Sequence, residues 1–128
     1  MGYESGTLTL ESHDAVTAIN KLQTAPPYPV EQAIKLLGGN IRTARLRRNL
    51  TIADLAEKIG TGTRPVADAE KGKPSTGIAV YVASLWALGL LDSLANVAAP
   101  EQDEEGQTLA LARERDRARP TSELDNDF

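Results

Sequence analysis

Residues 51–70, TIADLAEKIGTGTRPVADAE, constrain the fold most, because their spacing fits two short helices joined by a tight turn. Thr51 can cap a first helix whose apolar residues share one face: Ile52, Leu55, Ala56 and Ile59. Gly60 is expected to end it, since glycine adopts the left-handed conformation that many helix ends require. Pro65 fits the first turn of the second helix, where a missing amide costs nothing.

Small residues allow these two helices to cross closely. Ala56 and Ala69 permit the crossing, and Val66 is expected to face inward beside Ala69. The start of the second helix, from Thr61 to Arg64, would then stay exposed. A helix-turn-helix presents its second helix to the DNA major groove in this way, and a helix N-terminus attracts phosphate.

The pattern of Leu55-Ala56, Gly60 and Glu70-x-Gly72 resembles the Xre/Cro family of bacterial and phage helix-turn-helix regulators. Pro29 to Arg119 is similar to HipB-like antitoxins encoded beside Hip-type kinases, through IRTARLRRNLTIADLAEKIG, EKGKPSTG and LWALGLLDSLA. This resemblance implies an all-α, lambda-repressor-like domain of about five helices.

The resemblance also implies roles for individual residues. The DNA contacts it predicts are Thr51, Thr61, Gly62, Thr63, Arg64, Asp68, Lys71 and Lys73. The family often has Gln or Arg at the positions of Ile52 and Asp68, so Asp68 either accepts from a cytosine amino group or weakens DNA binding and faces a protein. Arg45 and Glu70 are expected to form a structural ion pair, since a buried charge needs a partner.

Charge is distributed unevenly along the chain. The net charge is −4, yet Lys35 to Lys73 holds nine basic and four acidic residues, a net +5, and the remainder carries −9. This predicts a basic middle that meets DNA, with acidic flanks that stay off DNA or meet another protein. A solvated surface without a partner is the alternative for the flanks.

Catalysis and metal binding have little support in this composition. The chain has no cysteine, which excludes disulfides, thiolate chemistry and a zinc finger. Its one histidine, His13, lies in a polar run, and no glycine-rich phosphate loop is present. We therefore expect no enzyme activity, no metal and no cofactor, and a cytoplasmic protein that joins the nucleoid when bound to DNA.

No charge occurs from Pro74 to Leu91, and the apolar part from Ile78 is only about fourteen residues, short of the ~20 that span a membrane. We predict a buried helix and no membrane contact; a β-strand through IAVYV is the alternative. With the segment Leu90–Val97, this helix is expected to form a homodimer interface, because helix-turn-helix modules often pair as two-fold dimers on palindromic sites. The predicted interface residues are Val80, Tyr81, Trp86, Leu90 and Leu91.

The sequence predicts three regions. Residues 1–29 form an extension with a helix over Leu10–Leu22 and a proline-rich hinge. Residues 30–99 form the helix-turn-helix and dimerisation domain, which begins with a helix from Val30 to Arg48. Residues 100–128 hold a flexible acidic joint (EQDEEG), a charged helix from Gln107 to Arg119 that Pro120 ends, and a flexible tail.

The tail ends on Phe128, the only phenylalanine, which is either disordered or an anchor for a pocket on a partner. The resemblance favours a co-encoded kinase toxin as that partner. The predicted function is thus a transcriptional regulator that binds a palindromic operator in double-stranded DNA, represses its own operon and acts as the antitoxin of a toxin-antitoxin pair. The alternative is a protein-interaction module with weak DNA binding, which Ile52, Gly62 and Asp68 favour.

Overall fold

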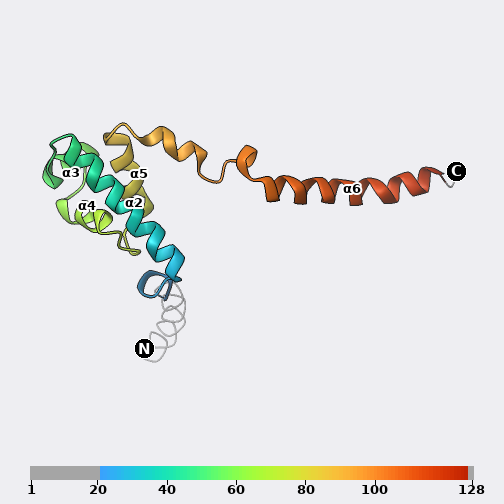
Figure 1. Ribbon diagram of the computed structural model, residues 1–128, viewed down its shortest axis with the longest axis horizontal. Helices are drawn as coiled ribbons and strands as arrows, with labels where there is room; N and C mark the ends of the chain where they lie inside the picture. Colours follow the sequence, from blue (N-terminus) through green and yellow to red (C-terminus); the bar gives the residue numbers. More distant parts are fainter. Residues whose placement is uncertain (1–20, 127–128) are drawn as a thin grey trace, which may run out of the picture. The chain divides into compact units, whose positions relative to one another are not determined.

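The computed structural model describes residues 21–126, with side chains to residue 119 (Figure 1). The chain divides into two units, Met1–Leu90 and Leu91–Phe128. The first unit contains α2 (Tyr28–Arg47), α3 (Ile52–Ile59), α4 (Thr63–Glu70) and α5 (Ile78–Ala87). The second contains the 3₁₀-helices η1 (Leu91–Asn96) and η2 (Pro100–Gln102), followed by α6 (Glu104–Asn126). The described part of the chain contains no strand, which confirms the all-α prediction.

Some predictions fall outside the described residues. His13 and Phe128 lie there, as does all of the predicted helix Leu10–Leu22 except its last two positions. The described chain opens with a helical turn at residues 21–24. The predicted domain boundaries stay a prediction.

The helix-turn-helix segment forms for the local reasons that its sequence suggests. Thr51 Oγ1 accepts a hydrogen bond from the Asp54 amide (3.0 Å), and the Asp54 carboxylate accepts one from the Thr51 amide (2.9 Å), a complete capping box. Gly60 ends α3 with φ +79°, a left-handed conformation. Pro65 lies in the first turn of α4, as predicted.

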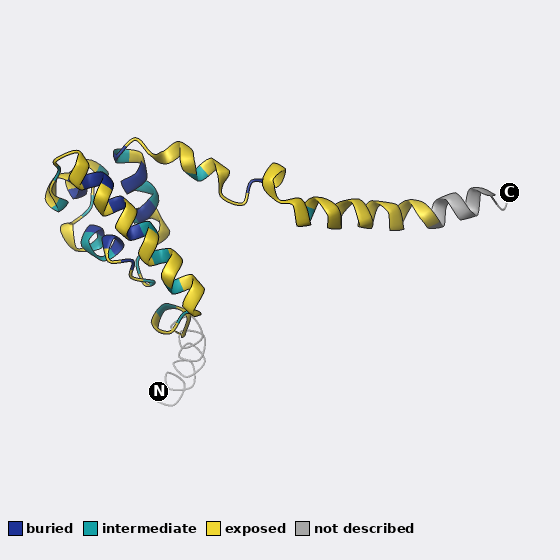
Figure 2. Ribbon diagram, in the orientation of Figure 1, coloured by how far each residue is buried: buried dark blue, intermediate teal, exposed yellow. Residues whose placement is uncertain are grey.

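The core of the first unit lies where α2, α3, α4 and α5 meet (Figure 2). α2 packs against α4 and α5, α3 packs against α4 and α5, and α4 packs against α5. Ile41, Leu55, Val66 and Leu85 contribute one buried apolar side chain from each helix. Four helices therefore share one core.

α5 differs from the predicted buried helix in two respects. It ends at Ala87 rather than Leu91, and Gly89 follows with φ +77°. Its exposed side includes Ile78 and Trp86, which are 70% and 60% exposed, so the predicted buried helix is buried on one face only. The buried face consists of Tyr81, Ser84, Leu85 and the adjoining Leu88.

Two further predictions, both about the second unit, are wrong. The acidic run is no flexible joint, because Asp103 caps α6 by accepting a hydrogen bond from the Gly106 amide (2.9 Å). Glu104 and Glu105 lie in its first turn, where the helix dipole favours negative charge. α6 also continues past Pro120 to Asn126, so the proline does not end it. A proline removes one backbone donor, which an otherwise continuous helix can tolerate with a kink.

Candidate nucleic-acid interface

The N-terminus of α4 lacks a side-chain cap. Its N-cap residue is Gly62, no side chain accepts from the first backbone amides, and the first turn contains no acidic residue. Gly62, Thr63 and Arg64 are exposed. By contrast, Thr51 and Asp54 form a capping box at the start of α3. The amides of Thr63 and Arg64 thus remain available to an anion, beside the Arg64 guanidinium.

An ion pair between Arg45 and Glu70 holds α4 in place from its other end. Arg45 Nε donates to Glu70 Oε2 (2.6 Å), and Arg45 Nη2 donates to Glu70 Oε1 (2.8 Å). Both residues are buried, and Arg45 Nη1 also donates to the Leu50 carbonyl (2.7 Å). The hydrogen bonds with Glu70 raise the pKa of Arg45 further above its usual value. This pair, expected from the resemblance, ties together α2, the turn before α3, and α4.

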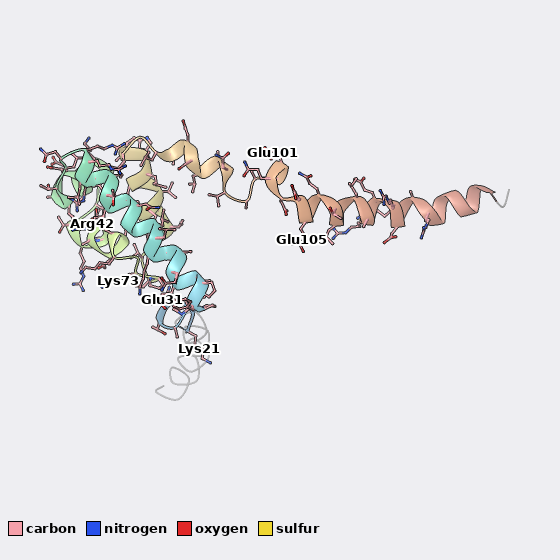
Figure 3. The ribbon with its side chains drawn as sticks, viewed as in Figure 1. Lys21, Glu31, Arg42, Lys73, Glu101 and Glu105 are labelled. Atoms are coloured by element: carbon pink, nitrogen blue, oxygen red, sulfur yellow. The ribbon has the colours of Figure 1, made fainter. Side chains whose placement is uncertain are left out.

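Basic side chains follow the C-terminal end of α4. Lys71 is the C-cap residue and is exposed, where the negative end of the helix dipole favours a cation. Lys73 follows in the next segment (Figure 3) and its Nζ lies 3.2 Å from Asp68 Oδ1. The Lys73 amide also donates to the Asp68 carbonyl (3.1 Å). Asp68 therefore carries a paired rather than a free negative charge.

A pocket of about 320 Å³ adjoins this pair. It lies between α4, the segment after it and the start of α5, and its lining is Pro65, Asp68, Ser75, Thr76, Gly77 and Val80. Sequence reasoning named Asp68 and Lys73 separately and missed both their pairing and the two hydroxyl residues beside them. The signal available was the short spacing of Asp68, Lys73, Ser75 and Thr76 around the helix end.

The remaining predicted contacts have local structural roles as well. Thr51 caps α3, and the Thr61 amide donates to the Ala56 carbonyl (3.0 Å) where α3 ends. Of the eight predicted contacts, Gly62, Thr63 and Arg64 lie together at the start of α4, and Lys71 follows its end. The described residues include no group of acidic or histidine side chains that could hold a metal ion.

The predicted dimer residues differ in how far they are exposed. Tyr81 is 4% exposed and its hydroxyl donates to the Lys73 carbonyl (3.1 Å), so its assignment to an interface is wrong. Burial raises its pKa above the usual value of a tyrosine. Trp86, Leu90 and Leu91 are exposed, and Val80 is half-buried beside the pocket near Asp68.

No known protein family, curated protein or solved structure gives a match to this chain. Among the described residues, no helix combines the length and apolar character needed to cross a membrane.

Proposed function

We propose that this protein is a sequence-specific DNA-binding regulator of the Xre/Cro helix-turn-helix type. In this proposal α3 and α4 are the two helices of the motif, and α4 enters the major groove with its N-terminal end. The observation that carries it is the uncapped start of α4, where Gly62, Thr63 and Arg64 are exposed and the first turn contains no acidic side chain. The net +5 charge of residues 35–73 supports the same role.

The pairing of Asp68 with Lys73 favours a direct contact between Asp68 and a DNA base. A paired carboxylate repels phosphate less than a free one, and its second oxygen can accept from a cytosine amino group. If the ion pair with Asp68 instead keeps the Lys73 charge from contacting DNA, the pairing favours the alternative of a protein-interaction module.

The rest of the proposal is based on the sequence resemblance to HipB-like antitoxins. We infer that the regulator represses its own operon, acts as a HipB-like antitoxin and binds a co-encoded Hip-type kinase through the tail that ends at Phe128. It would act in the cytoplasm as a homodimer on a palindromic operator. The exposed side of α5, with Ala79 and Trp86, is the proposed dimer surface.

Titration of the protein against the DNA upstream of its own gene tests the proposal. The experiment uses near-physiological salt, excess unrelated competitor DNA and fluorescence anisotropy. Arg64→Ala should cost roughly 1–3 kcal/mol of operator affinity, and affinity should fall steeply as salt rises. Arg113→Ala, the same charge change in α6, should leave affinity unchanged. Equal affinity for operator and competitor would favour the interaction module.

A further inference from the structure

α6 is exposed on every side in the described part of the chain. Of residues 104–119, all except Gly106 are exposed, and Leu109 and Leu111 are 57% and 55% exposed. None of the ion pairs among the described residues lies within this helix. A helix in water gains most of its stability from packing or from such pairs. This 23-residue helix therefore has surface that a partner could cover.

One stripe of α6 is complementary to itself. Glu105, Leu109 and Arg113 are four residues apart in turn, so they lie along one face of the helix. The acidic and the basic residue are equally far from the leucine, on opposite sides of it. A two-fold axis through Leu109 would therefore place this leucine on its counterpart in a second copy. The same axis brings Glu105 of each copy opposite Arg113 of the other.

Small residues flank Leu109 on the same face. Gly106 lies three residues before it, and Ala112 lies three residues after it. The two-fold axis through Leu109 places Gly106 of one helix opposite Ala112 of the other. The distance between two packed helices depends on the side chains at the contact, and small ones allow a close approach. The two leucines can therefore reach each other.

The other exposed leucine lacks this complementarity. Leu111 has Gln107 one turn before it and Arg115 one turn after it, so an antiparallel pair centred there would join no opposite charges. Parallel pairing through the first stripe would bring Glu105 beside Glu105 and Arg113 beside Arg113, and like charges in contact repel. Charge therefore favours one face of α6 and one direction of pairing.

We propose that α6 binds α6 of a second copy of this chain as an antiparallel pair centred on Leu109, with Glu105–Arg113 ion pairs on both sides of the leucines. The contact extends over about two helical turns, so the association is weak and forms at raised protein concentration. It does not depend on the proposed function or on the exposed side of α5. At the low protein concentration of the operator titration the pair is dissociated, so Arg113→Ala remains a valid control there.

Disulfide trapping tests the face of the helix, because the chain has no cysteine of its own. Leu109→Cys places one thiol of each copy at the two-fold axis, and Leu111→Cys is the matched control on the opposite face. Both positions are exposed, so neither substitution removes a buried contact. At raised protein concentration in glutathione buffer, Leu109→Cys should form linked dimers roughly tenfold faster, since a disulfide needs closely approaching Cβ atoms. Equal rates would overturn the proposal, because contacts elsewhere in the chain affect both variants alike.

A mixture of two further variants tests the direction of pairing. Glu105→Cys and Arg113→Cys are oxidised separately and together. In the mixed pair the two thiols face each other, and the remaining glutamate and arginine still form one ion pair. In a pair of like variants the thiols are eight residues apart along the helix, about 12 Å, and both ion pairs are lost. We expect mixed dimers to dominate; a statistical mixture, or faster linkage of like variants, would overturn the antiparallel arrangement.

Discussion

Gly38 and Gly72 meet backbone to backbone where α2 passes the end of α4. A side-chain carbon at Gly38 would lie 2.9 Å from the Gly72 nitrogen, and one at Gly72 would lie 2.8 Å from the Lys35 nitrogen. Gly72 also has φ +70°, a conformation that other residues rarely adopt. The close approach of α2 and α4 therefore requires glycine at both positions, because each has only a hydrogen atom where another residue would have a side chain.

Gly38→Ala should destabilise the fold by about 2–3 kcal/mol, because the added methyl group meets the backbone of α4. Gly39→Ala is the matched control, since a side-chain carbon there has nothing within 4 Å. It should stabilise the fold by about 0.5–1 kcal/mol through helix propensity. Urea unfolding followed by circular dichroism measures both, and equal effects of the two substitutions would contradict this account of the helix crossing.

Arg45→Ala should destabilise the protein by about 3–5 kcal/mol, because it leaves the Glu70 carboxylate buried without its partner. Lys35→Ala breaks the exposed pair with Glu31 and should leave the urea midpoint almost unchanged. A similar midpoint for the two variants would show that the buried pair has no special role in holding α4.

Asp54 should make stability depend on pH. The Thr51 amide, followed by its hydroxyl, holds the pKa of Asp54 below its usual 3.8. Because the folded-state pKa is lower, ionised Asp54 stabilises the fold above about pH 4, and this stabilisation is lost as pH falls through the folded-state pKa. Asp54→Asn should therefore lower the thermal midpoint at pH 7, with the difference shrinking in acid. A difference independent of pH would exclude the carboxylate as its cause.

Ser84→Ala should stabilise the protein by about 1 kcal/mol. The Ser84 hydroxyl is fully buried in α5, and its oxygen has no hydrogen-bond partner in the described part of the chain. Alanine removes the unsatisfied group and favours the helix. Ser75→Ala, at an exposed position, should change the free energy of unfolding by less than about 0.5 kcal/mol. A loss of stability in Ser84→Ala would indicate that the hydroxyl has a partner.

Local rules predicted the helix-turn-helix segment because its signals lie within a few residues of each boundary. Thr51 and Asp54 begin α3, Gly60 ends it, and Pro65 marks the first turn of α4. The same rules apply to Asp103, yet the acidic run around it lacks apolar residues, so the sequence predicts a flexible joint there. Its role as a cap depends on the Gly106 amide, which only a continuing helix presents.

Long-range packing limited the rest of the prediction. α5 is apolar on nearly every side, so its sequence could not show whether Tyr81 or Trp86 faces the core. The packing of α5 against α2, α3 and α4 determines its buried face, and this face includes Tyr81. The pairing of Asp68 with Lys73 likewise depends on how the chain turns after Glu70.

Trp86 is the only tryptophan in the chain, and this residue is 60% exposed in the folded protein. Its emission should therefore be that of an indole in water before and after denaturation, which makes tryptophan fluorescence a poor reporter of unfolding. The same exposure makes it a direct reporter of assembly. A blue shift on raising the protein concentration, or on adding a partner, would mark the moment at which another surface covers α5.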